Sequence, residues 1–192
     1  DMGTGTGLVA LMLAQRSHEH CQIEAIELDP LAAQQAQENF KASPWHNRLH
    51  LTHQDVQTYC QQTTYQFDLI VANPPYFVQG VECKNDERAL ARYIQQSHLD
   101  WLNWAASCLS EKGKISFVLP YEAGKTLINS TALYCIKQTN VITKIGKDPQ
   151  RLLLTFSREH LPQIKDSLVI YDESNQYTEA FIALTKAFYL KM

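Results

Sequence analysis

Hydrophobic and polar positions follow two different periods along this chain. Short apolar runs, typical of buried strands, occupy residues 22–28, 49–55, 67–73 and 114–120. Stretches with helical spacing lie between them, at residues 7–17, 29–43 and about 88–109, and the segment Glu111-Lys112-Gly113 is expected to end the last of these helices. Asp29 and Pro30 are expected as the N-cap and the first residue of the second helix. Strands that alternate with helices in this way are typical of a parallel sheet wrapped by helices on both faces. The pattern therefore predicts a doubly wound α/β fold.

The last third of the chain predicts a different local arrangement. A helical pattern near 122–135 precedes two apolar runs, "NVITKIG" at 140–146 and "RLLLTFS" at 151–157. Only the short segment "KDPQ" separates these runs, which leaves no room for a crossover helix. We therefore expect a mostly parallel sheet that ends in a C-terminal antiparallel hairpin.

The chain opens on a glycine loop, "DMGTGTG", at residues 1–7. In doubly wound folds such a loop follows the first strand of the sheet. No strand-like run precedes it in this sequence, so we expect that the first strand is missing. The expected organisation is a single domain over residues 1–192, truncated at its N-terminus.

Composition limits the possible classes of protein. The 192 residues are 45% hydrophobic and include no apolar run near the ~20 residues that cross a bilayer, which favours a soluble domain without a membrane partner. The five cysteines are scattered, with no C-x-x-C pair, which favours a reducing cytoplasm. The histidines, including "HEH" at 18–20, lack zinc-site spacing, so we expect no metal. The net charge of −3 neither requires nor excludes a nucleic-acid partner.

The glycine loop has two possible roles. Gly3, Gly5 and Gly7 precede an apolar helix, where they could bring a ligand close to backbone N–H groups or could simply form a tight turn. Their spacing, G-x-G-x-G, differs from the G-x-G-x-x-G of dinucleotide sites. The carboxylate of Asp1 would repel a pyrophosphate and attract an ammonium group. We therefore expect a ligand with an amino group near this end.

Two further acids follow predicted strands. Glu27 ends the run "EAIEL", where a carboxylate can accept hydrogen bonds from both ribose hydroxyls or can simply be a solvated strand end. Asp55 could accept from an adenine amino group beside Val56, or could cap the helix that follows it, and the two roles can coexist. An ammonium, a ribose and an adenine in this order describe S-adenosyl-L-methionine, which is the expected cofactor.

The segment "NPPY" at residues 73–76 ends a predicted buried strand. Two prolines explain why the strand stops, but they do not explain the asparagine before them and the tyrosine after them. The segments "DMGTGTG", "AIELDP", "HQD" and "FDLIVANPPYF" resemble the successive motifs of class I S-adenosylmethionine-dependent methyltransferases of the N-P-P-Y branch. The downstream stretch from "NPPYFVQG", the run "KISFVLP" and the tail "YTEAFIALTKAFYLKM" are similar to bacterial tRNA adenine-N6 methyltransferases that modify the adenine next to the anticodon of a valine tRNA. The resemblance covers nearly the whole chain.

This resemblance implies roles for the motif. The Asn73 side-chain carbonyl and the Pro74 backbone carbonyl would hold the two hydrogens of an adenine amine and make its nitrogen nucleophilic. Pro75 would stiffen this geometry. Tyr76 and Phe77 would stack on the flipped base.

The substrate is less clearly indicated than the reaction. Basic side chains that could contact tRNA phosphates are Arg88, Arg92, Lys144, Lys147 and Arg151, although a solvated surface explains them equally well. Two alternatives stay open: a glutamine-N5 methyltransferase that acts on release factors, which uses the same motif on a planar amide, and a cofactor- or RNA-binding module without catalysis. The intact motif argues against the second alternative.

Overall fold

The computed structural model describes residues 1–75 and 97–189 and divides into two compact units, Asp1–Gly113 and Lys114–Met192. Each unit is described below by itself. The expectation of a single domain over residues 1–192 stays a prediction. In the part of the chain that the structure describes, no helix has both the length and the apolar character needed to cross a membrane.

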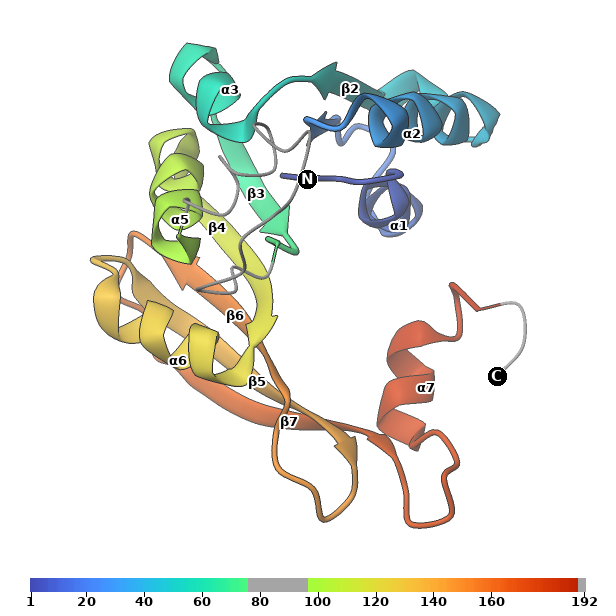
Figure 1. Ribbon diagram of the computed structural model, residues 1–192, viewed down its shortest axis with the longest axis vertical. Helices are drawn as coiled ribbons and strands as arrows, with labels where there is room; N and C mark the ends of the chain where they lie inside the picture. Colours follow the sequence, from blue (N-terminus) through green and yellow to red (C-terminus); the bar gives the residue numbers. More distant parts are fainter. Residues whose placement is uncertain (76–96, 190–192) are drawn as a thin grey trace, which may run out of the picture. The chain divides into compact units, whose positions relative to one another are not determined.

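The first unit alternates helices and strands as the sequence predicts (Figure 1). Its elements are α1 (Leu8–Arg16), β1 (Ile23–Glu27), α2 (Pro30–Ala42), the 3-10 turn η1 (His46–Arg48), β2 (Leu49–His53), α3 (Val56–Gln62), β3 (Phe67–Ala72), α5 (His98–Ser107) and the first residues of β4 (Leu109–Pro120). The predicted N-cap of α2 is confirmed, because the Asp29 carboxylate accepts from Ala32 N at 2.8 Å with Pro30 in the first turn.

The N-terminal residues are part of the sheet. β1 and β2 pair in parallel, and Met2 forms parallel bridges to Ile26 of β1 and Ala72 of β3. Met2 N donates to Val71 O at 2.9 Å, and Ile26 N donates to Asp1 O at 3.0 Å. Met2 therefore lies between β1 and β3, in the position that the first strand of a doubly wound sheet occupies. The glycine loop leaves the sheet at this point.

The core of the first unit packs α1 and α2 against β1 and β2. Its fully buried members include Ala10, Ala14, Ala25, Ala36 and Phe40. Four of these five residues are alanines, and small side chains allow helices and sheet to approach closely.

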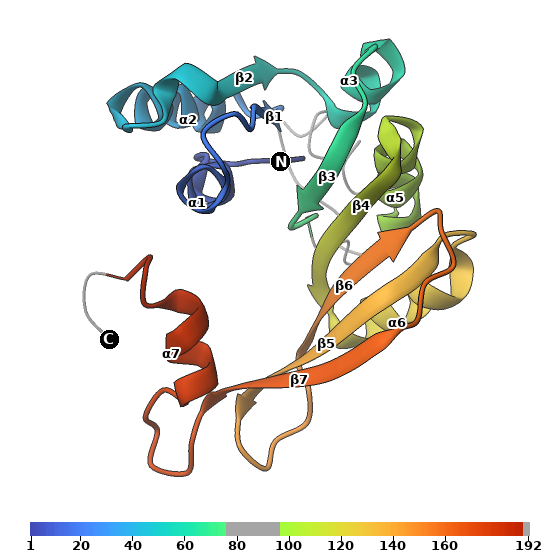
Figure 2. The same ribbon diagram turned by 180° about the vertical axis from the view of Figure 1, so that it is seen from behind.

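The second unit is a mixed sheet with helices (Figure 2). It comprises the rest of β4, α6 (Tyr121–Ser130), β5 (Tyr134–Lys144), β6 (Arg151–Ser157), β7 (Ile164–Tyr171) and α7 (Glu179–Thr185). β6 pairs antiparallel with both β4 and β5, and β7 pairs in parallel with β5. Figures 1 and 2 show α6 on one face of this sheet, where a Cβ on Gly124 would lie 2.9 Å from Leu152 Cδ1. The predicted C-terminal antiparallel hairpin is confirmed as β5 and β6.

The helix expected over about 88–109 is wrong at a described position. Ser97 is extended and its side chain caps a helix that begins at His98 and ends at Ser107, so a continuous helix through Ser97 is excluded.

Two further predicted boundaries are wrong. The helix expected at 122–135 ends at Ser130, because Thr131 adopts an extended conformation and Tyr134 and Cys135 pair with β6. The strand expected from Lys114 already begins at Leu109. Its internal Gly113 lies so close to Phe67 O that a Cβ there would be 2.8 Å away, so this glycine permits a close backbone approach and does not end a helix.

Candidate active site

The predicted site segments of the first unit follow the carboxyl ends of neighbouring strands. The glycine loop follows Met2, Glu27 ends β1, Asp55 follows β2, and Asn73 follows β3. Parallel strands bring these ends to one edge of the sheet, where ligands of open α/β sheets bind. Backbone contacts join the segments, since Thr4 N donates to Ile26 O at 2.9 Å and Gln54 N donates to Glu27 O at 3.0 Å.

The glycine loop has the conformation that its sequence predicts. Gly3, Gly5 and Gly7 have φ values of 67°, 58° and 84°, in the left-handed region that favours glycine. A Cβ on Gly5 would meet nothing within 4 Å, so a ligand has access to the backbone there. The Asp1 carboxylate accepts from Thr4 Oγ1 at 2.6 Å, which orients this acid within the loop.

Glu27 is the polar centre of this edge. Its carboxylate accepts backbone hydrogen bonds from Gly5 at 2.7 Å, Leu28 at 2.9 Å and Asp29 at 2.8 Å. The residue is only 9% exposed, so the alternative of a solvated strand end is wrong. Oε1 accepts two of these bonds and Oε2 accepts one, which leaves acceptor capacity on Oε2. The three bonds fix the carboxylate between the glycine loop and the start of α2.

Asp55 caps α3. Its Oδ1 accepts from Thr58 N at 3.0 Å and from Thr58 Oγ1 at 3.2 Å, so the structural role expected for it is confirmed. The Val56 side chain is 1% exposed and contributes to the core. The adenine contacts of Asp55 and Val56 stay predictions.

The segment after β3 exposes its amide and buries its first proline. Asn73 and Pro75 are exposed, whereas the Pro74 side chain is fully buried. Tyr76, Phe77, Arg88 and Arg92 lie outside the described residues.

Sequence reasoning did not single out α5 as part of the site. Burial lowers the pKa of His98, and a hydrogen bond with the Pro75 backbone carbonyl partly opposes this effect. The next turn of the same helix carries Trp101, whose Cη2 would lie 3.0 Å from a Cβ on Gly3. The available signal was the sequence "SHLD", because Ser97 and Asp100 form a capping box that fixes the start of α5.

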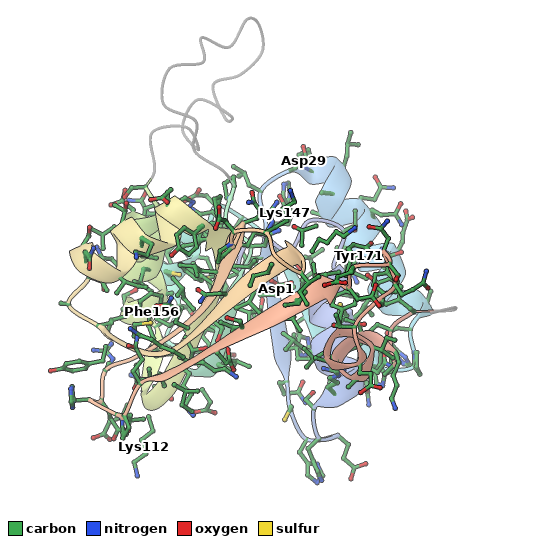
Figure 3. The ribbon with its side chains drawn as sticks, turned by 90° about the horizontal axis from the view of Figure 1, so that it is seen from below. Asp1, Asp29, Lys112, Lys147, Phe156 and Tyr171 are labelled. Atoms are coloured by element: carbon green, nitrogen blue, oxygen red, sulfur yellow. The ribbon has the colours of Figure 1, made fainter. Side chains whose placement is uncertain are left out.

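Three of the five basic residues predicted to contact tRNA lie in the second unit. Lys144 ends β5, Arg151 begins β6, and Lys147 lies in the turn between them. Lys144 Nζ donates to Asn175 Oδ1 at 2.7 Å, and Lys144 is the register partner of Tyr171 in β7. Figure 3 labels Lys147, which lies in the turn after β5, and Tyr171, the last residue of β7.

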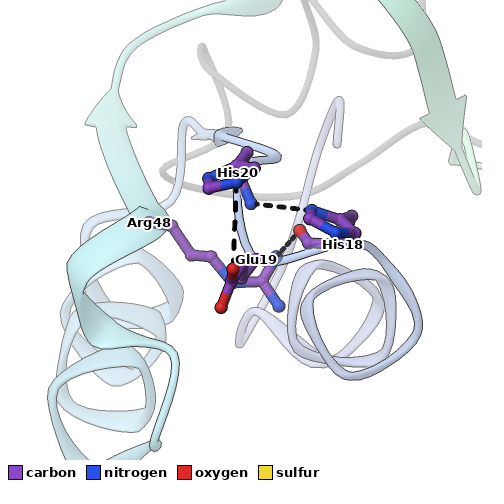
Figure 4. Close-up of polar contacts among 4 residues, drawn as sticks. All are labelled: His18, Glu19, His20 and Arg48. Carbon is purple, nitrogen blue, oxygen red and sulfur yellow. Dashed lines mark hydrogen bonds and ion pairs between the residues drawn. The ribbon is translucent and has the colours of Figure 1, made fainter.

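The histidine-rich segment at 18–20 belongs to a structural contact. His20 pairs with Glu19 at 3.8 Å and its backbone N–H donates to His18 Nδ1 at 3.4 Å, while Arg48 donates to His18 O at 3.4 Å (Figure 4). Within residues 1–75 and 97–189, no group of three or more His, Cys, Asp or Glu side chains could hold a metal ion.

Comparison with protein families gives one match and many similar proteins. The family model of the methyltransferase small domain matches residues 1–133. A Haemophilus influenzae protein named tRNA1(Val) (adenine(37)-N6)-methyltransferase is 69% identical over all of this chain and 82% of its own length. A Pasteurella multocida protein with the same name is 60% identical over 99% of this chain and 81% of its own length.

Solved structures agree on the fold. A predicted O-methyltransferase from Agrobacterium tumefaciens matches with a TM-score of 0.73 at 16% identity, covering 95% of this chain and 85% of its own. The ribosomal protein L11 methylase of Lactobacillus delbrueckii matches with a TM-score of 0.56 at 18% identity, covering 83% of this chain and 68% of its own. These likenesses show a Rossmann-like α/β fold of the class I methyltransferase type, as the sequence predicts.

Proposed function

Because the chain belongs to the methyltransferase small-domain family, we propose that it transfers a methyl group from S-adenosyl-L-methionine to the exocyclic N6 amine of an adenine in tRNA. The observation that carries this proposal is the assembly of the glycine loop, Glu27 and Asn73-Pro74 at one edge of parallel strands. The substrate is taken to be the anticodon-loop adenine of a valine tRNA, because relatives 54–70% identical to the chain carry that name. The reaction would take place in the cytoplasm.

The residues at this edge fit the cofactor. Open space beside Gly5 and the remaining acceptor capacity of Glu27 Oε2 match a ligand that approaches the loop and presents ribose hydroxyls. Asp1 supplies a carboxylate suited to the ammonium group of the amino-acid portion. When bound, S-adenosyl-L-methionine supplies a methyl group activated by a sulfonium. Gly3, Gly7, Asp55 and Val56 complete the proposed cofactor site.

The proposed task of Asn73 and Pro74 is to make a poor nucleophile reactive. The lone pair of an adenine amine is delocalised into the ring, so the amine must become tetrahedral before it attacks. The Asn73 side-chain carbonyl and the Pro74 main-chain carbonyl would accept its two hydrogens and favour that geometry. The exposed Asn73 side chain can reach a substrate, and the buried Pro74 ring fixes the backbone. Pro75 would stiffen the segment, and Tyr76 and Phe77 would stack on the base.

The substrate is tested by supplying two candidates to the same protein. The protein with labelled S-adenosyl-L-methionine is incubated with undermodified total tRNA and, separately, with a release factor. Label in tRNA, recovered as N6-methyladenosine after nuclease digestion, is the expected result. Label in the release factor alone would contradict the RNA substrate, and label in neither would support the binding module without catalysis.

The role of the motif is tested with Asn73→Ala. The loss should fall on the chemical step, by about 2.7–4 kcal/mol or about 10²–10³-fold, if this acceptor resembles other preorganised groups. Single-turnover rates at saturating cofactor and tRNA measure the step, and calorimetry should show unchanged cofactor affinity. Asn129→Ala, at an exposed position of α6, is the matched control. Equal rates for Asn73→Ala and the parent would leave the motif with only its strand-ending role.

A further inference from the structure

The turn that follows β1 presents Glu27 to the proposed cofactor site. Glu27 Oε1 accepts from Leu28 N at 2.9 Å and from Asp29 N at 2.8 Å, so two successive peptide N–H groups point at one oxygen. Glu27 Oε2 accepts from Gly5 N at 2.7 Å and keeps the acceptor capacity that is proposed for the ribose. The direction in which Oε2 points therefore depends on the orientation of these two peptide units.

The end of β2 holds the same two peptide units at their carbonyl groups. β1 and β2 pair in parallel, with His53 as the register partner of Glu27. Gln54 N donates to Glu27 O at 3.0 Å, and the N–H of that peptide unit belongs to Leu28. His53 Nε2 lies 2.9 Å from Leu28 O, and the N–H of that peptide unit belongs to Asp29. A carbonyl oxygen only accepts, so the His53 ring donates through Nε2.

A peptide unit transmits orientation because it is planar. In a trans peptide the C=O and the N–H point in opposite directions, and no cis peptide occurs in the described part of the chain. The bond from His53 to Leu28 O therefore also orients the Asp29 N–H, which donates to Glu27 Oε1. Hydrogen bonds in such a chain polarise and strengthen one another. Gln54 acts through its backbone, so His53 is the member of this arrangement that a substitution can remove.

We propose that His53 is a positioning residue for the cofactor, which orients the Leu28–Asp29 peptide and, through it, the Glu27 carboxylate. This inference rests on the proposed function, and it adds a residue beyond those predicted to bind S-adenosyl-L-methionine. His53 is exposed at the carboxyl end of β2, so it holds the turn without contributing to the core. Because it acts through Glu27, its effect on cofactor affinity depends on Glu27.

The first test compares side chains that can and cannot donate from the position of Nε2. His53→Ala removes the donor, His53→Gln places an amide N–H near the position of Nε2, and His53→Asn places one near that of Nδ1. We expect His53→Ala and His53→Asn to raise the Kd for S-adenosyl-L-methionine about threefold to tenfold, the scale of one hydrogen bond. His53→Gln should restore most of the affinity. Calorimetry measures the Kd, and an unchanged Kd in His53→Ala or a loss that His53→Gln does not restore would contradict the proposal.

His50→Ala is the matched control. His50 is also exposed on β2, and its Nε2 hydrogen-bonds to Gln22 Oε1 at 2.9 Å near the amino end of the strand. Its substitution removes a similar bond away from the proposed cofactor site, so the Kd should match that of the parent. Equal losses of affinity in His50→Ala and His53→Ala would mean that β2 is merely weakened, and would exclude a positioning role.

The second test asks whether His53 acts through Glu27. In a double-mutant cycle, His53→Ala should add little to the loss of affinity that Glu27→Ala causes, because the carboxylate that His53 orients is already absent. Losses that add in full would assign His53 a role independent of Glu27 and overturn the proposal.

A third measurement needs no cofactor. Hydrogen exchange of the Asp29 amide, followed by NMR, should become about threefold to tenfold faster in His53→Ala and should stay at the rate of the parent in His50→Ala. Unchanged exchange in His53→Ala would show that the ring does not hold this peptide. If the parent bound no S-adenosyl-L-methionine, the proposed function would fail, whereas the exchange of the Asp29 amide would still test His53.

Discussion

Single residues of the glycine loop have different neighbours although they share one backbone conformation. Gly5 and Gly7 both have positive φ, so alanine is strained at either position. A Cβ on Gly7 would lie 2.5 Å from Phe40 Cε1, whereas a Cβ on Gly5 would meet nothing within 4 Å. The two positions therefore separate a packing role from a ligand-binding role.

We expect Gly7→Ala to lower the free energy of unfolding by about 1–3 kcal/mol more than Gly5→Ala, because only Gly7→Ala adds overpacking to the shared strain. Gly5→Ala should instead weaken binding of S-adenosyl-L-methionine, since its methyl group enters the open space proposed for the cofactor. Urea denaturation and calorimetry measure the two effects. Equal destabilisation by both substitutions would contradict the contact with Phe40.

Local signals in the sequence predicted the residues whose partners are near in the chain. Asp29 and Asp55 were predicted as N-caps because the side chain of an N-cap accepts from a backbone N–H only three residues later, so both partners lie in one short segment of sequence. The burial of Glu27 was not predicted, because one of its three donors comes from Gly5 in a distant loop.

At the scale of elements, α1 depends on a side chain from another segment. Arg48 is 5% exposed, and its guanidinium donates to Ser17 Oγ at 2.8 Å, to Cys21 O at 3.4 Å and to Ala14 O. The last carbonyls of a helix lack intrahelical partners, and a cation there also interacts favourably with the helix dipole. Arg48 thus secures the end of α1 and the turn that leads into β1.

We expect Arg48→Ala to lower the free energy of unfolding by about 1.5–3 kcal/mol, because it leaves buried carbonyls without a charged donor. The free energy of unfolding of Arg48→Lys should lie between those of the parent and Arg48→Ala, since lysine keeps the charge but lacks the planar guanidinium group. Thermal or urea unfolding measures the change, with Lys41→Ala on the exposed side of α2 as the control. If Arg48→Ala matched that control, the helix-ending role of Arg48 would be excluded.

Element boundaries were predicted well where the apolar periodicity is clear, and poorly where pairing with a neighbouring strand determines where an element begins or ends. The strand over 67–73 and the helix over 29–43 agree with β3 and α2 to within about a residue at each end. Tyr134 and Cys135 continue a helical pattern, yet they join β5 because β6 offers them partners. β7 was not predicted at all, because its hydrogen bonds come from β5 along a parallel edge.

At the scale of the whole molecule, charge does not favour RNA. The chain has a net charge of −3, so attraction to phosphates must come from local clusters. Lys144, Lys147 and Arg151 gather around the β5–β6 turn and are the cluster that we propose for tRNA binding, with Arg88 and Arg92 as further proposed contacts outside the described residues. The bond from Lys144 to Asn175 fixes one of these cations in place, but it does not neutralise it.

Replacing Lys144, Lys147 and Arg151 together with alanine should make tRNA binding less dependent on salt. A protein that makes fewer phosphate contacts releases fewer counterions when it binds. If all three side chains contact phosphates, the slope of log K against log salt should become shallower by about 2–3. The matched control replaces Lys41, Lys112 and Lys186, which are exposed, so that both variants lose three positive charges. Cofactor affinity should be unchanged in both, since none of these residues belongs to the proposed cofactor site. An equal change of slope in the two variants would mean that total charge alone controls binding, and an unchanged slope would assign the turn cluster to ordinary solvated surface.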